Sequence, residues 1–478
     1  MLTTGKRLGR AAGAATIAVV LLCGCSLMPR ERVNPGVLPT AWQDAPVTSE
    51  LPLTDWWTQF NDPTLNQLIS EALTNGPTVQ LAAYRLTEAR AQAQAGVATN
   101  LPSLSAFGTG TFNREIGASH QGTEQMSGSF GPQATWEVPL FGRIQAAIAG
   151  ARANVALARS DARGTQVALA ADVAQAYIDL RAAQNGYAAL SELANSSAQL
   201  ADILDTSANA GIAAPADAAN ARRLAESTRA QLADLVIAQR QAENRLAVLR
   251  GLSPGTESPE MKAALDATQA TPTLSLPGAP AAPAAPADLV RLRPDVAQAE
   301  AQTLLSAAAL GNARANLLPQ LNLTGSITTT RNIIGSPTAE GRPALTGTPL
   351  ITIPLFDWGA LRAQSRQANA QFHESLIQYK QTVTQAVAEA SNALAALDQG
   401  QQRLQAARNA EAAAQRSDNG SRAAYGAGMQ SLADRLTADQ QLIDARVTRI
   451  NAEQSEANAA IAVFRAFGGG PSFAVQPH

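Results

Sequence analysis

Pro77-Thr78-Val79 begins a stretch of the sequence that ends at Leu101-Pro102, and Pro294-Asp295-Val296 begins a second stretch that ends at Leu318-Pro319. The two starts and the two ends are each 217 residues apart (294 − 77 and 319 − 102). Similarity at a fixed offset indicates one structural unit used twice. This repeat decides the fold, because each element expected in one copy is also expected in the other.

Other features recur with the repeat. Three pairs of residues share the offset of 217: Gly211 and Gly428, Asp217 and Asp434, Gly251 and Gly468. Val138-Pro139-Leu140-Phe141-Gly142 returns as Ile353-Pro354-Leu355-Phe356-Asp357, at an offset of 215 (353 − 138). We therefore expect a first repeat at 77–271, a Pro/Ala-rich extended linker at 272–287, a second repeat at 288–470 and a C-terminal tail at 471–478.

Each repeat should contain a helix, two strands and two long helices. The expected strands lie at about 102–113, 128–141, 319–331 and 345–356, and the expected long helices at about 143–206, 215–250, 359–424 and 431–467. A helix over 143–206 would be ~96 Å long. Apolar and small residues recur in it at spacings of four and three: Leu169, Val173, Ala176, Leu180, Ala183, Tyr187, Leu190. The partner helix repeats the pattern at Leu232, Leu235, Gln239, Ala242, Leu246 and Leu249. This spacing predicts coiled-coil packing.

The four strands alternate between apolar and polar residues. Val138, Leu323 and Ile353 belong to the apolar set, and Asn322 belongs to the polar set. Such strands occur in transmembrane barrels, with lipid outside and water inside, but also in soluble half-buried sheets. Four strands cannot close a barrel in lipid, because their edges would stay unpaired. Three protomers would supply twelve strands, which is wide enough for an aqueous lumen.

The N-terminus has the pattern of a lipoprotein signal. Lys6, Arg7 and Arg10 precede an apolar stretch at 11–22 that is too short to span a bilayer. Leu22-Cys23-Gly24-Cys25 resembles a lipobox, so we expect a signal peptide at 1–24, lipidation of Cys25, and an extended segment with a short helix at 25–76. The alternative is a plain secretory signal with two incidental cysteines.

The composition excludes several classes of function. Aromatic residues make up 4% and charged residues 15%, which suits thin layers of helices better than a thick core. The net charge of −2 gives no case for a nucleic-acid partner. His120, His373 and His478 lack ligand spacing, and phosphate loops and nucleophile elbows are missing from the sequence. The sequence therefore predicts neither an enzyme nor a bound metal or cofactor.

Several longer motifs together resemble one family. They are Trp56-Trp57-Thr58-Gln59-Phe60-Asn61-Asp62-Pro63, Arg291-Leu292-Arg293-Pro294-Asp295-Val296, Leu318-Pro319 and Ile353-Pro354-Leu355-Phe356-Asp357-Trp358-Gly359. The chain resembles the TolC/OprM-like outer-membrane factors, in particular the NodT-type lipoproteins that serve RND efflux pumps. Leu292 and Ala360 depart from the usual pattern, in which arginine is common at both places.

The resemblance implies a mainly α protein with transmembrane β-strands. A homotrimer would form a twelve-stranded β-barrel in the outer-membrane lipid and a long coiled-coil α-barrel in the periplasm. The hairpin turns at Gly211, Ile212, Gly428 and Met429 would meet a periplasmic adaptor, which connects the channel to an inner-membrane RND transporter. Asp434, Asp217 and Gln430 would belong to the periplasmic gate, with Gln430 where relatives have arginine. Asp434 and Asp217 also fit as first-turn helix acids.

The sequence thus predicts a passive exit duct for small molecules or drugs. One alternative is a type I protein-secretion duct, which the lipobox makes less favoured. Another is a periplasmic coiled-coil scaffold lipoprotein, which would not explain the two paired sets of alternating strands. A substrate is not encoded in these motifs.

Overall fold

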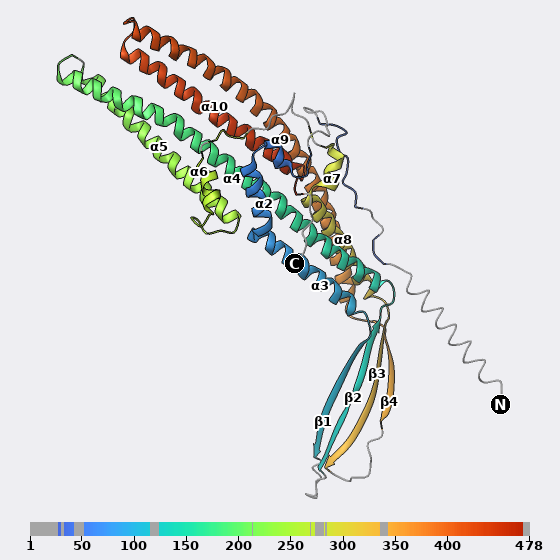
Figure 1. Cartoon of the computed structure of the whole chain (residues 1–478). Helices are drawn as coiled ribbons and strands as arrows, with labels where there is room; N and C mark the ends of the chain where they lie inside the picture. Colours follow the sequence, from blue (N-terminus) through green and yellow to red (C-terminus); the bar gives the residue numbers. More distant parts are fainter. Residues whose placement is uncertain are drawn as a thin grey trace, which may run out of the picture. The chain divides into compact units, whose positions relative to one another are not determined.

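The fold is built from two copies of one helix–strand–strand–helix–helix unit (Figure 1). The computed structural model describes residues 27–29, 33–42, 52–114, 124–212, 214–267, 269–272, 282, 284–334 and 343–471. The first copy comprises α3 (Pro77–Ala98), β1 (Ser103–Arg114), β2 (Glu124–Val138), α4 (Arg143–Asn209) and α5 (Pro215–Leu249). The second comprises α8 (Pro294–Ala315), β3 (Gln320–Ile334), β4 (Ala344–Thr352), α9 (Ala360–Gly426) and α10 (Leu432–Ala466).

Corresponding helices of the two copies have the same length. The first helices have 22 residues each, the second 67 and the third 35. Within the described ranges, five shorter elements lie outside this pattern: η1 (Trp56–Phe60), α2 (Pro63–Asn75), α6 (Pro259–Asp266), η2 (Pro286–Asp288) and α7 (Leu289–Leu292).

Two strands end earlier than predicted. We expected β2 to continue to about residue 141 and β4 to about residue 356, but they end at Val138 and Thr352. Pro139 and Pro354 follow closely, and proline has no N–H to donate to a strand ladder. Ile353 therefore lies just outside β4.

The predicted repeat alignment also needs a correction after these prolines. Phe141 and Gly142 have φ angles of 53° and 81°, and Trp358 and Gly359 have φ angles of 55° and 82°. These two left-handed turns are equivalent and lie 217 residues apart (358 − 141). The offset of 215 at Val138 and Ile353 thus reflects two additional residues before the second turn.

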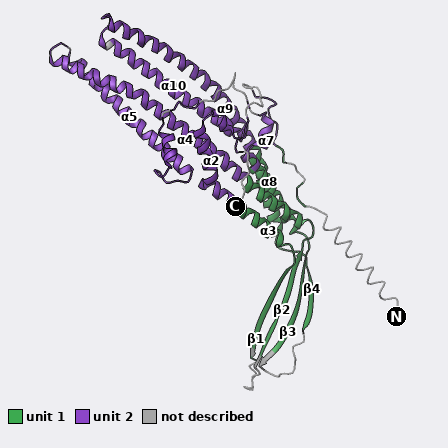
Figure 2. Ribbon diagram, in the orientation of Figure 1, with its two compact units in different colours: residues 1–34, 86–159, 298–380 green, residues 35–85, 160–297, 381–478 purple. Residues whose placement is uncertain are grey.

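The chain divides into two compact units, shown in Figure 2. Unit 1 comprises residues 1–34, 86–159 and 298–380, and it contains the sheet. The four strands are antiparallel in the order β1-β2-β3-β4. In the helical part of unit 1, a small core joins α8 to α9 through Leu310, Ala368, Phe372 and Leu376.

Unit 2 comprises residues 35–85, 160–297 and 381–478, and it contains the main core. Trp56 is fully buried, and its ring stacks on Phe464 of α10 at 5.0 Å between centroids. Small residues at the helix seams, such as Ala174, Ala390 and Ala457, are also fully buried. Alanine lets helix axes approach closely. Most of the core is therefore a layer of closely packed helices, and the aromatic side chains form only part of it.

Within unit 2, the two long hairpins α4–α5 and α9–α10 pack against each other (Figure 1). The predicted heptad positions of α4 are buried except Tyr187, which is 40% exposed. Leu190 and Leu193 contact Ile443 of α10, and Leu200 packs with Leu432 and Leu436. Among the described helices, none is long and apolar enough to cross a bilayer.

Candidate functional site

The sheet of unit 1 has one apolar face drawn from all four strands. The register places Leu104 opposite Ala134, Trp136 opposite Leu323, and Leu323 opposite Pro349. Side chains on one face of a sheet follow every second residue, so these positions share a face. The larger apolar members are Leu104, Phe112, Met126, Phe130, Pro132, Trp136, Val138, Leu321, Leu323, Ile327, Leu345, Pro349 and Ile351. Many are exposed in the single chain, including Leu104 and Leu345 at 79% and 82%. An apolar surface of this extent needs lipid or another chain to cover it.

The opposite face of the sheet is mostly polar. Its members include Ser103, Ser105, Thr109, Thr111, Ser127, Ser129, Gln133, Thr135, Glu137, Asn322, Thr324, Ser326, Thr346 and Thr348. The Ser129 and Thr330 hydroxyl oxygens lie 3.1 Å apart across β2 and β3. Val138 and Leu323 therefore lie on the apolar face and Asn322 on the polar face, as the alternation predicts. The sheet can separate an apolar medium from water.

The outer strands β1 and β4 leave the sheet with two open edges. In the described sheet, β1 pairs with β2 alone and β4 with β3 alone. Each edge presents backbone N–H and C=O groups that would be costly to leave unpaired in an apolar medium. A sheet of this kind is complete only when its edges meet further strands.

The two hairpin turns at the far ends of the long helices have the same geometry. Gly211 and Gly428 have φ angles of 73° and 71°, and no atom lies within 4 Å of a Cβ built on either glycine. The next N–H, of Ile212 or Met429, donates to the carbonyl five residues back, at 2.8 Å in both turns. These are Schellman motifs, which explains why glycine recurs there. Ile212 and Met429 are left 83% and 75% exposed.

The predicted gate residues lie just beyond these turns. Ser431 caps α10: its Oγ accepts from the Asp434 N–H at 3.1 Å, and the Asp434 Oδ2 accepts from the Ser431 N–H and Oγ–H at 3.3 and 2.7 Å. Asp434 is exposed, as is its repeat mate Asp217 in the first turn of α5. Gln430 accepts a hydrogen bond from Ser421 at 2.8 Å. The capping box gives Asp434 a structural role, but its carboxylate remains available to solvent.

Each hairpin is closed by an ion pair near its turn, and the charges are reversed between the repeats. In the first hairpin Arg222 of α5 pairs with Asp205 of α4. In the second, Arg422 of α9 pairs with Asp439 of α10 at 2.9 Å. Position 422 is the mate of 205, and 439 is the mate of 222, each at the repeat offset of 217. The contact is thus repeated while acid and base exchange places. Arg422 also pairs with Asp418 at 2.8 Å, whose side chain is fully buried.

Further from the turns, a ladder of charges connects α9, α10 and α4. Its members alternate in sign: Glu192, Arg446, Glu411, Arg449, Glu453 and Arg408. Beside the ladder, Glu456 of α10 is 2% exposed, and burial raises its pKa to about 7. The positive charge of Arg408 opposes this rise in pKa, and the negative charge of Glu453 adds to it. A pKa of about 7 means that the charge of Glu456 changes near neutral pH.

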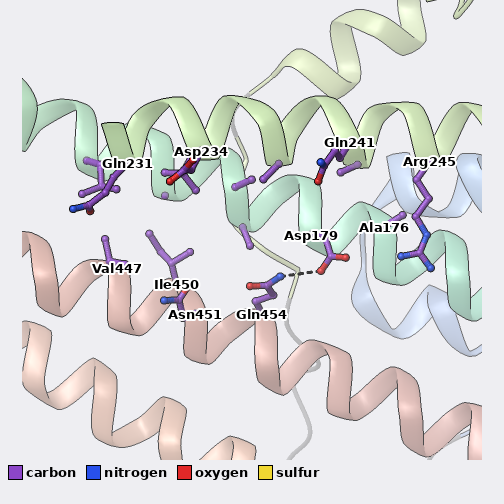
Figure 3. A pocket seen from close by; sticks show the side chains of 17 residues that line it. Ala176, Asp179, Gln231, Asp234, Gln241, Arg245, Val447, Ile450, Asn451 and Gln454 are labelled. Carbon is purple, nitrogen blue, oxygen red and sulfur yellow. Dashed lines mark hydrogen bonds between the residues drawn. The ribbon is translucent and has the colours of Figure 1, made fainter. Parts of the chain in front are cut away.

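A partly open cavity lies between the hairpins in unit 2. It has a volume of about 680 Å³ and is lined by α4, α5 and α10 (Figure 3). Gln454 of α10 donates to Asp179 of α4 across it at 2.8 Å. Asp234 and Arg245 of α5 line the other side. All three helices contribute polar side chains to its lining, and its alanines come from α4 and α5.

The sequence motifs contain structural residues whose roles the sequence did not reveal. Arg293 is 7% exposed and donates to Asp295, to Glu389 of α9 and to the carbonyl of Ala466 at the end of α10. Burial alone would raise the pKa of Asp295, but hydrogen bonds and charge from Arg293 hold that pKa below its ordinary value. Asp62 caps α2 and accepts from the Tyr177 hydroxyl at 2.7 Å. The only sign in the sequence that Asp62, Arg293 and Asp295 have structural roles was that they lie within the long motifs.

Some predicted sites lie outside the described residues. Cys25, His120 and His478 are among them, so lipidation at Cys25 stays a prediction. Within the described ranges, no group of three or more His, Cys, Asp or Glu side chains is placed to hold a metal ion.

Comparison with known proteins gives matches along almost the whole chain. The family model for outer membrane efflux proteins matches residues 68–252 and 286–469, one segment in each repeat. The toluene efflux pump outer membrane protein TtgC of Pseudomonas putida is 29% identical over 467 residues, covering 95% of this chain and 94% of TtgC. The probable outer membrane lipoprotein SilC of Salmonella typhimurium is 26% identical, covering 95% and 97%.

A solved structure has the same fold. The outer-membrane channel OprN superposes with a TM-score of 0.82 at 26% identity, covering 93% of this chain and 99% of that one. The similarity thus includes the sheet and both long hairpins, which are the parts that carry the candidate site.

Proposed function

The chain belongs to the outer membrane efflux protein family, and we propose that it is the outer-membrane channel of a tripartite efflux system. It would act as a passive exit duct, receiving small molecules from an inner-membrane pump. This proposal rests on one observation above the others. A four-stranded sheet with one apolar and one polar face has two open edges and continues into helices too long for a compact domain.

The open edges support a homotrimer. If β4 of one protomer pairs with β1 of the next, three sheets close into a twelve-stranded barrel with no unpaired edge. The apolar face would then meet lipid and the polar face would line water. The same three chains would contribute four long helices each to a periplasmic α-barrel.

The hairpin turns are the proposed contact with a periplasmic adaptor. Ile212 and Met429 project from identical turns, and they are among the most exposed apolar side chains. Apolar groups presented by rigid turns suit burial against another protein. The adaptor would connect the channel to an RND transporter, which supplies the energy and selects the substrate.

We place the gate at Asp434. Three copies around one axis would concentrate negative charge, and such a ring would bind cations. Asp434→Asn removes the charge but keeps an oxygen for the capping box. In a reconstituted channel it should weaken block by polyvalent cations applied from the periplasmic side, with trimers intact. Asp217→Asn is the matched variant in the other repeat. Unchanged block in both would show that these acids act only as first-turn acids of their helices.

Conductance tests the function itself. The purified protein should open discrete channels in a planar lipid bilayer, and its gene should restore efflux to a strain that lacks its own outer-membrane channel. A protein that binds membranes but never conducts would instead support the scaffold alternative. Export of a protein but of no small molecule would support a type I secretion duct.

A further inference from the structure

The short segment of Leu27 and Met28 contacts α8 of unit 1 at a defined place. Arg314 near the end of α8 donates from Nη1 to the Leu27 carbonyl at 3.2 Å. The other terminal nitrogen of Arg314 lies 3.4 Å from Oδ1 of Asn369 on α9, which orients the guanidinium. The segment is thus bonded to a side chain that is itself fixed.

Gly311, one turn before Arg314, provides the space for Met28. A Cβ built on Gly311 would lie 2.7 Å from Cγ of Met28 and 3.3 Å from Cβ of Ala146 on α4. Gly311 is buried and helical, so its backbone conformation does not require glycine. The absence of a side chain is required only by the close approach of Met28 and Ala146.

We propose that Gly311 and Arg314 form a docking site for the segment that follows the lipidated cysteine. The inference rests on the proposed lipidation of Cys25. Leu27 is two positions after Cys25, so their Cα atoms are at most about 7 Å apart. β3 begins at Gln320, six residues after Arg314 (320 − 314). The site therefore holds the lipid attachment point at the end of the sheet where all four strands join helices, and the acyl chains enter the leaflet that contains this end of the barrel.

A cysteine pair tests the contact in the full-length lipoprotein. Met28→Cys with Gly311→Cys should form a disulfide, because a Cβ at position 311 lies 2.7 Å from Cγ and 3.6 Å from Cα of Met28, which brings the two Cβ atoms close enough for one. Met28→Cys with Ala309→Cys is the control, since Ala309 lies on the opposite, exposed side of α8 at the same height. After denaturation, a maleimide–polyethylene glycol reagent should add to neither cysteine of the first variant and to both of the control. Equal addition to the two variants would overturn the proposal.

The same reagent reports lipidation separately. Cys25 carries a thioether when it is lipidated, so a chain that is not lipidated gains at least one further addition in both variants, and a second where the signal peptide with Cys23 is retained. Failure of lipidation is thereby distinguished from failure of docking. In the native trimer, Gly311→Val should raise the labelling rate of Met28→Cys several-fold, whereas Ala309→Val should leave it unchanged. An unchanged rate with Gly311→Val would also contradict the docking site.

Discussion

At the scale of single residues, the sheet register makes a test of its two faces possible. Ile327 lies near the middle of β3 on the apolar face, opposite Leu345, and its neighbour Ser326 lies on the polar face. Leu323 is closer to the helical end of the strand, where the cost of a charge in lipid is smaller. An arginine facing lipid near the bilayer centre costs about 2–4 kcal/mol.

Ile327→Arg should therefore reduce the yield of membrane-inserted trimer, while Ser326→Arg should insert normally and change the single-channel conductance. Heat-modified mobility on gels measures the trimer, and planar bilayers measure conductance. If both variants insert equally well and conduct alike, the assigned faces are wrong.

Glu456 predicts a pH dependence of stability. Its ordinary pKa is 4.5, and burial raises it to about 7 in the folded chain. Between these values the unfolded chain releases the proton and the folded chain keeps it. The free energy of unfolding should thus fall as the pH rises from 4.5 to 7, and level off above that. The change is on the order of 3 kcal/mol.

Glu456→Gln should remove this fall in the free energy of unfolding. The variant should therefore become more stable relative to the unsubstituted protein as the pH rises to 7.5. Thermal unfolding of the detergent-solubilised protein across pH 4.5–8 measures the difference. Glu374→Gln, on an exposed face of α9, is the matched control. Parallel pH profiles for the Glu456 variant and the unsubstituted protein would show that Glu456 does not hold its proton.

The sequence predicted some residues better than others. The turn glycines were found because a left-handed backbone conformation favours glycine, which can be recognised in the sequence. The partners of Arg293 and Arg422 and the burial of Glu456 were not found, because they come from helices whose contacts depend on folding. Local motifs do not show which buried acid meets which base across a hairpin.

At the scale of elements, the reversed ion pairs predict unequal hairpins. Arg222 and Asp205 are 64% and 30% exposed, so their pair should contribute less than about 1 kcal/mol. Arg422 neutralises two acids, of which Asp418 is fully buried, so its loss leaves a buried charge without its base. Removing Arg422 should therefore destabilise its hairpin more than removing Arg222 destabilises the equivalent hairpin of the first repeat.

Arg422→Ala should lower stability by about 2 kcal/mol, allowing for the half-exposed guanidinium. Arg222→Ala should have little effect. Hydrogen exchange at the ends of α4, α5, α9 and α10 measures each hairpin separately. Adding Asp418→Asn should recover much of the loss in the Arg422 variant. Equal exchange in the two single variants would mean that the buried acid is not the reason for the difference.

The elements themselves followed closely from the sequence. Helices and strands were expected from periodicity and from proline and glycine positions, and the turns at Gly211 and Gly428 lie where they were expected. The strand ends at Val138 and Thr352 were missed, although Pro139 and Pro354 mark them, because the apolar alternation continues past both prolines.

At the scale of the whole molecule, the repeat explains why a single chain is incomplete. Two copies of one unit give two strand pairs that join at β2 and β3, and they leave β1 and β4 as edges. The sequence suggested this incompleteness, since four alternating strands cannot close in lipid. It could not suggest the proposed docking site for the N-terminal segment, which depends on Gly311 and on Met28, a neighbour distant in sequence.

Closure of the barrel between protomers is the central claim, and disulfide scanning across the β1 and β4 edges tests it most directly. Thr346→Cys on β4 is combined in turn with cysteine at Ser103, Ser105, Thr109 or Thr111 of β1, all on the polar face. At least one pair should give a ladder on non-reducing gels that stops at three covalently joined chains, while single-cysteine variants should not pass a dimer. A ladder continuing beyond three chains, or no cross-link at any register, would contradict a closed trimer of four-stranded sheets.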